Sequence, residues 1–147
     1  MVCTHEDCKN KTSEFKLYCN RHCKELFGAY VKKSGIRNAG QGLWAVKEFK
    51  RNQRIAQYGF DHIKITEKAF ERKFKKEKDR EYLICDAGTC WDARAKDSTI
   101  ARFANDARNP DKNNAEFRIL RGVPWIVATK TIGVGMEIFV NYGEEYW

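Results

Sequence analysis

The chain has 147 residues, a formal net charge of +8 and a sequence pI of about 9.2. This length suits one domain with room for a small accessory segment, and the basic charge favours an acidic neighbour such as nucleic acid or a nucleoprotein. There is no run of 18 apolar residues and no basic-then-apolar leader, which argues against a membrane-spanning helix and a secretory signal and predicts an intracellular protein.

The first 23 residues hold four of the six cysteines, spaced Cys3-x4-Cys8-x10-Cys19-x2-His22-Cys23. Cysteines crowded in this way in an intracellular protein are typical of metal ligands, and a segment so short and polar cannot bury a core of its own. Tetrahedral zinc would supply the missing folding energy. We predict a zinc ion with the ligands Cys3, Cys8, Cys19 and His22. Cys23 or His5 could replace His22, and free surface thiols are the competing interpretation.

The segment from Leu26 to Lys33 links this region to a strand, and a glycine-rich turn follows. Gly40 and Gly42 flank one glutamine before the apolar run Leu43-Trp-Ala-Val46. A Gly-x-Gly before a strand lets backbone amides approach a ligand closely, although the third glycine and the helix of a dinucleotide site are missing. A plain hairpin turn is the simpler interpretation of these glycines.

The middle of the chain predicts short strands and one helix. The charged run Thr66–Tyr82 has Ala69, Phe70 and Phe74 at helical spacing and predicts an amphipathic surface helix. Cys85 and Cys90 are expected to be small buried residues. Alternation and turn residues predict strands at Arg54–Gly59, within Glu81–Asp92, at Glu116–Leu120 and at Trp125–Ala128.

The last strand ends in aromatic residues. Glu137–Tyr142 alternates apolar and polar side chains, and Gly143 permits a sharp turn after it. By itself this pattern is typical of a core or edge strand whose tyrosines, with Trp147, fill a hydrophobic cluster.

Four runs nevertheless stand in a recognisable order: Gly40-Gln-Gly-Leu-Trp-Ala45, Tyr58-Gly59, Arg102-Phe-Ala-Asn-Asp106 and Glu137-Ile-Phe-Val-Asn-Tyr-Gly143. Together they resemble the SET domain of protein lysine methyltransferases, over about Lys33 to Trp147. The resemblance implies a mainly β fold with one or two helices, a β-clip of several small sheets in which the segment near Asn105 passes under the C-terminal loop as a pseudoknot. We divide the chain into a Cys/His zinc-binding module at 1–28 and a SET domain at 29–147.

The family's site residues carry over to matching positions of this chain. The resemblance makes Tyr142 the catalytic tyrosine, with its hydroxyl near the reacting methyl group. It assigns S-adenosylmethionine binding to Gly40, Gly42, Leu43, Trp44, Arg102, Phe103, Asn105 and Asp106. The channel for the substrate lysine would be lined by Tyr58, Phe117, Val140 and Tyr146. Because Phe117 and Val140 lack the hydroxyl that holds a blocking water in some relatives, we expect more than one methyl group to be added.

Two departures from the family pattern bear on function. The family's usual His-Ser-Cys after the asparagine is Asp106-Ala-Arg108 here, which removes a histidine contact to the cofactor. Many relatives carry a cysteine-rich segment that closes the channel after the last tyrosine, whereas this sequence ends at Trp147. Tyr146 with Trp147, a continuation of the chain or a second copy in a homodimer would have to close it.

The resemblance implies an S-adenosylmethionine-dependent protein-lysine N-methyltransferase, a nuclear enzyme of chromatin that acts on histone lysines. Its partners would be a lysine-containing histone tail and nucleosomal DNA, with no membrane. Methylation of a nonhistone protein would need only a different substrate. The alternative from another class is a noncatalytic SET-like module that binds nucleic acid or nucleosomes through its zinc knuckle and basic surface.

Overall fold

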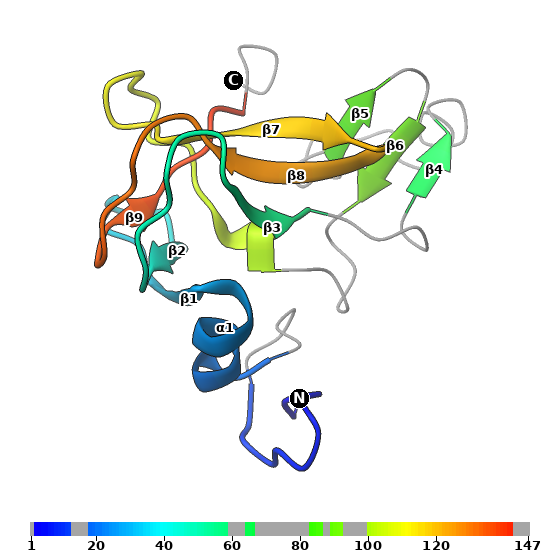
Figure 1. Ribbon diagram of the computed structural model, residues 1–147, viewed down its shortest axis with the longest axis vertical. Helices are drawn as coiled ribbons and strands as arrows, with labels where there is room; N and C mark the ends of the chain where they lie inside the picture. The colour runs from blue at the N-terminus through cyan, green and yellow to red at the C-terminus, as the bar shows by residue number, and fades with distance from the viewer. Residues whose placement is uncertain are drawn as a thin grey trace.

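The fold is built from three small antiparallel sheets, shown in a computed structural model that describes residues 2–12, 18–58, 64–66, 83–86, 89–92 and 100–142 (Figure 1). The first sheet has the order β1-β2-β9, with β1 at Ala29–Lys33, β2 at Gln41–Ala45 and β9 at Glu137–Ile138. The second has the order β3-β8-β7, with β3 at Arg54–Gln57, β8 at Val123–Ala128 and β7 at Ala115–Leu120. The third has the order β4-β6-β5, with β4 at Lys64–Thr66, β6 at Thr89–Asp92 and β5 at Leu83–Asp86.

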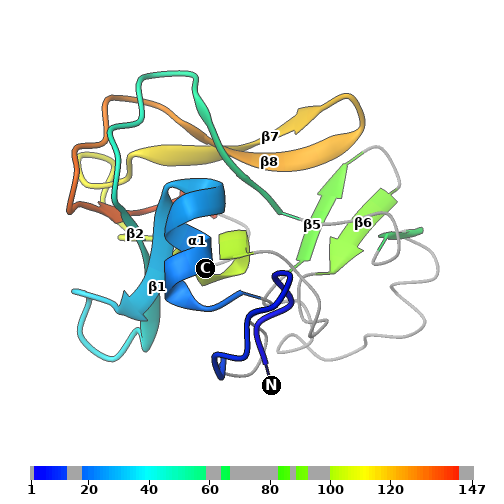
Figure 2. The same cartoon turned by 60° about the horizontal axis from the view of Figure 1, so that its bottom comes forward.

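Two short helical segments accompany these sheets in the part of the chain that the structure describes. Helix α1 (Asn20–Phe27) lies against β1, and the 3-10 helix η3 (Ile100–Phe103) contacts β1, β2 and β3 (Figure 2). The predicted mainly β fold with one or two helices is therefore confirmed. Within the described ranges, no helix is long and apolar enough to cross a membrane.

The β7–β8 hairpin follows from local sequence. Leu120 pairs with Val123, so the loop has two residues, Arg121 and Gly122, with φ of 51° and 77°. Positive φ at both positions gives the turn the twist that antiparallel strands need, and glycine adopts it without strain. Pro124 pairs with Ile119 inside the hairpin, so the observed strand begins before Trp125, where we predicted its start.

Helix α1 is not among the elements predicted from the sequence. It includes Leu26 and Phe27, which we assigned to a link, and it ends at Gly28 in the left-handed conformation (φ 69°). Glycine is the usual residue at this position because it has no Cβ. Cys23 is fully buried in the main core cluster with Ala29 and Leu43, so the helix packs onto the first sheet. The division at residue 28 stays a prediction.

The third sheet covers only part of the segment, residues 66–92, for which we predicted a helix and short strands. Strands β5 and β6 confirm the prediction of short strands within Glu81–Asp92, and Cys90 is fully buried and disulfide-bonded rather than a free thiol. Thr66 lies in β4, so the prediction that a helix begins at this residue is wrong. The rest of that predicted helix, 67–82, lies outside the described residues.

The C-terminal segment passes between two points of one loop. The backbone N–H of Val140 donates to Asn105 O (2.8 Å), while Phe139 O accepts from the N–H groups of Asn114 and Ala115 (3.0 Å each). The chain after β9 is therefore held between residue 105 on one side and residues 114–115 on the other. This arrangement is the predicted pseudoknot, and it brings residues 139–140 to the segment that follows η3.

Candidate active site and metal centre

Tyr142 lies where the pseudoknot closes. Its hydroxyl donates to the backbone oxygen of Ala104 (2.5 Å), and its backbone N–H donates to the Asp106 carboxylate (2.9 Å). The side chain is half-buried against the main core. The phenol oxygen is thus held at a defined point, with its proton committed to the carbonyl of Ala104.

An aromatic cluster leads away from this hydroxyl. The ring of Tyr142 stacks on Phe117 of β7 with centroids 6.3 Å apart, and Phe117 meets Tyr58 edge-on at 5.1 Å. Tyr58 follows β3 and is 5% exposed. Rings arranged in this way exclude water and present the negative faces of their π systems, which attract cationic nitrogen.

The turn that contains Gly40 and Gly42 forms a second part of the site. The side-chain amide of Asn105 donates to Gln41 O (2.8 Å), which joins the segment after η3 to the start of β2. Gly40 has φ 72° and open space where a side chain would be. The indole N–H of Trp44 is buried without an acceptor among the described residues. An open backbone turn and, further along the same strand, an unsatisfied donor fit a ligand with polar atoms, as an adenosyl amino-acid cofactor has.

Arg102 and Asp106 are buried charged residues at the ends of this segment. The Arg102 guanidinium is 6% exposed and lies over the ring of Phe103, 5.6 Å from its centroid. The Asp106 carboxylate accepts from Arg108 N (2.7 Å) and from the Asn113 amide (3.0 Å) as well as from Tyr142. Asp106 therefore fastens its own loop and the backbone of Tyr142.

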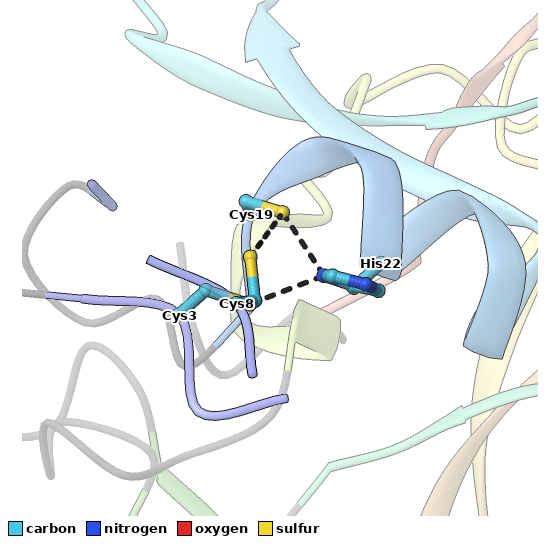
Figure 3. Close-up of side chains that lie close together, drawn as sticks. All are labelled: Cys3, Cys8, Cys19 and His22. Atoms are coloured by element: carbon cyan, nitrogen blue, oxygen red, sulfur yellow. Dashed lines mark hydrogen bonds between the residues drawn. The ribbon is translucent and has the colours of Figure 1, made fainter. Parts of the chain in front are cut away.

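The four predicted metal ligands converge on one point near the N-terminus (Figure 3). The Nδ1 atom of His22 is 3.3 Å from the sulfur of Cys3 and 3.2 Å from that of Cys19, and the Cys8 and Cys19 sulfurs are 3.9 Å apart. All four ligand atoms lie within 4.8 Å of one another. Three thiolates and one imidazole at this spacing fit the tetrahedral coordination of structural zinc.

The alternative ligands lie outside this cluster. The sulfur of Cys23 points to the backbone oxygen of Tyr18 (3.4 Å) from within the core, and the His5 ring stacks on His22 at 3.8 Å. Burial raises the pKa of the Cys19 thiol, but hydrogen bonds from the Asn10 side chain and the His22 backbone outweigh it and lower this pKa to about 6. Cys19 is therefore a thiolate at neutral pH, the form that binds metal.

Comparison with known proteins identifies the fold. Residues 40–143 match the SET domain family. The chain belongs to the SET-domain family. No curated protein matches it.

Solved structures with the same SET fold come from polycomb repressive complex 2. One, of ctPRC2 in an autoinhibited conformation bound to S-adenosylmethionine, has a TM-score of 0.60 and 22% identity over 80% of this chain. Another, an active polycomb repressive complex 2 in the basal state, has a TM-score of 0.62 and 25% identity over 79%. A humanized mutant of the Chaetomium thermophilum complex bound to the inhibitor GSK126 gives 0.62 and 24% over 79%. The chain spans 15% of the length of each of these chains.

The structure brings some of the predicted SET-domain site residues together in space. Tyr58, Phe117 and Tyr142 share one aromatic cluster, and Asn105 contacts the turn that contains Gly40. Val140 is fully buried in the core and forms a backbone bridge with Ala115. Leu43 is also fully buried, and it pairs with Val31 of β1 and with Ile138 of β9. Tyr146 and Trp147 lie outside the described residues.

Sequence reasoning missed the role of Asn114, which we had placed in a loop. Its buried side chain, 2% exposed, donates to Glu137 O (3.0 Å) and accepts from Phe139 N (2.8 Å). One amide thus pairs with the backbone on both sides of Ile138. No local pattern marks this asparagine, because its partners are more than 20 residues away in the chain.

Asn114→Ala is expected to destabilise the SET domain by about 2–5 kcal/mol, because it leaves two buried backbone groups without partners. Urea unfolding followed by tryptophan fluorescence measures the change. Asn109→Ala is the matched control, since Asn109 makes only a local turn contact to the Asp111 N–H (2.9 Å) through its side chain. Equal losses for both variants would contradict the bridging role of Asn114.

Proposed function

We propose that this SET domain is an S-adenosylmethionine-dependent protein-lysine N-methyltransferase whose substrate is a histone tail. The observation that carries the proposal is the Tyr142 hydroxyl, held on Ala104 O at the end of the Tyr58–Phe117 cluster and close to the Asn105 contact. Family membership supports the reaction, and the chromatin complexes among the similar structures support the histone substrate.

The cofactor, when bound, supplies an electrophilic methyl group on a sulfonium. A substrate amine would use its lone pair to form a bond to the methyl carbon as the carbon–sulfur bond breaks, and the electron pair of the broken bond would stay with sulfur. The residues of this chain have no covalent step to perform, so their work is alignment and exclusion of water. The rings of Tyr58, Phe117 and Tyr142 favour the neutral amine by desolvation and then accommodate the methylated cation.

The arrangement of Tyr142 suits this reaction. Because its proton is donated to Ala104 O, the phenol oxygen presents lone pairs rather than a proton to the channel. Lone pairs stabilise the positively polarised hydrogens of a methyl group in transfer. Asn105 and the Gly40–Trp44 backbone would hold the cofactor on the other arm of the site.

The same proposal includes structural zinc on Cys3, Cys8, Cys19 and His22, since these atoms fit its coordination. The zinc would fasten the segment before α1 to that helix, because Cys19 precedes α1 and His22 lies within it. A histone substrate places the protein in the nucleus. The pairing of two copies to close the channel stays a prediction.

The test is methylation of core histones and a panel of lysine peptides by the purified chain with labelled cofactor. Histones are expected to carry label, and mass spectrometry is expected to show products with more than one methyl group. Label on nonhistone proteins alone would overturn the histone substrate. Strictly monomethylated product under excess cofactor would overturn the prediction that more than one methyl group is added.

A noncatalytic module is the second candidate, favoured by one observation. Asp106 replaces the family's histidine, and its carboxylate is engaged by the protein's own backbone and Asn113. No methyl transfer, together with DNA binding that weakens steeply with salt, would establish this alternative.

A further inference from the structure

Glu137 is a buried carboxylate that the reaction does not use. It lies in β9, is 5% exposed, and forms no ion pair within the part of the chain that the structure describes. Its two oxygens accept from the Ser34 hydroxyl (2.6 Å) and from the Gly35 N–H (2.7 Å). Burial of a carboxylate is unfavourable unless hydrogen bonds compensate for the lost hydration. We therefore expect both contacts to be retained in the folded protein.

These contacts determine the shape of the turn between β1 and β2. The Ser34 hydroxyl oxygen also accepts from Ile36 N (3.1 Å), and the Ser34 N–H donates to Gly40 O (2.8 Å). The turn that ends at Gly40 is therefore closed on Ser34, and Ser34 is fastened to Glu137. The chain leaves this turn directly into the backbone assigned to cofactor binding.

Gly42 shows how tightly Glu137 fits against this backbone. A Cβ on Gly42 would lie 2.5 Å from a Glu137 carboxylate oxygen, closer than real Cβ atoms approach, and 3.0 Å from the Glu137 Cδ. The Cα of Ser34 would be 3.2 Å away. The Glu137 carboxylate and the Ser34 backbone thus occupy the space that a side chain at position 42 would need. Gly40 differs, because its surroundings are open.

Glu137 also connects this turn to the pseudoknot. Its backbone oxygen accepts from the Asn114 amide (3.0 Å), and on the other side of the turn Gln41 O accepts from Asn105 (2.8 Å). The Gly40–Leu43 backbone is therefore held between Glu137 and Asn105. A shift of the carboxylate would move the cofactor-binding backbone relative to Tyr142.

We propose that Glu137 is a positioning residue for the cofactor-binding backbone, and that residue 42 must be glycine because of the Glu137 carboxylate rather than because of the cofactor. The binding part of this inference rests on the proposed S-adenosylmethionine site. The structural part does not, because it concerns the turn alone.

A double-mutant cycle tests the pair with S-adenosylhomocysteine as the probe, its binding measured by calorimetry. Gly42→Ala alone is expected to weaken binding about tenfold or more, as for residues in direct contact. In the Glu137→Ala background the same change is expected to cost less than about threefold, because the collision with the carboxylate is gone and only the 3.2 Å approach to the Ser34 Cα remains. Additive losses would show that the cofactor needs the space and would overturn the proposal.

Hydrogen exchange in the protein without ligand gives an independent readout. Glu137→Ala is expected to raise amide exchange at Gly35 and over residues 40–43, and Glu137→Gln, which keeps one acceptor oxygen, is expected to raise it less. Glu116→Gln on β7 is the matched control and should leave this turn unchanged. Unaltered exchange in Glu137→Ala would overturn the positioning role. If the wild-type chain bound no S-adenosylhomocysteine while exchange rose as expected, the proposed function would fail and the structural role would stand.

Discussion

Tyr142→Phe is expected to lower kcat for methyl transfer by roughly 10²–10³, the effect of removing one group that stabilises developing charge. The variant removes a single oxygen atom. The ring is expected to keep its place, because its stacking on Phe117 and the bond from its backbone N–H to Asp106 do not involve the hydroxyl. The loss would therefore come from the reacting centre rather than from the fold.

The stability of Tyr142→Phe distinguishes a loss of activity at the reacting centre from a loss caused by unfolding. Loss of the hydroxyl leaves Ala104 O without this donor, which should cost about 1–3 kcal/mol. Urea unfolding and kcat are measured on the same preparations at a temperature where the variant is fully folded. Tyr18→Phe is the matched control, since Tyr18 is a half-buried tyrosine that packs edge-on to Phe27 near α1. A kcat within about threefold of wild type would contradict a catalytic role for Tyr142.

The elements that were predictable from sequence depend on near neighbours in the chain. Alternation and turn residues predicted β2, β3 and the β7–β8 pair, because strand faces and tight turns leave a short-range pattern. The Cys/His cluster was predictable for a related reason: few residue types suit zinc, and the spacing of these four in the chain is compact. The site residues of the SET domain came from the order of motifs, since no single motif was specific.

The contacts that organise the site leave no such local trace. The Asn114 amide meets Glu137 across 23 residues, the Asp106 carboxylate meets Tyr142 across 36, and the Ser34 hydroxyl meets Glu137 across 103. Asn, Asp and Ser are also ordinary loop residues, so their composition indicated turns. Long-range pairing of buried polar groups is decided by the fold, and only coordinates reveal it.

Helix α1 was missed for a different reason. Half of its eight residues are good helix formers, but a helix of this length is marginal in isolation. Its support is tertiary: Cys23 packs in the core, and Cys19 and His22 face the metal cluster from adjacent turns. The helix is therefore expected to depend on whatever binds at that cluster.

Removal of the metal is accordingly expected to unfold the segment before β1. Zinc contributes on the order of 10 kcal/mol to small Cys/His sites, far more than the burial available to this segment. A chelator, or Cys19→Ser, is expected to lower bound zinc from one ion per chain, measured by elemental analysis, and to lower helical circular dichroism and the unfolding midpoint. Cys23→Ala is the matched control, because its sulfur lies in the core outside the cluster, and it should retain the ion. Full zinc content in Cys19→Ser would refute the ligand set. An unchanged unfolding midpoint after complete zinc removal would show that the core holds α1 without the metal.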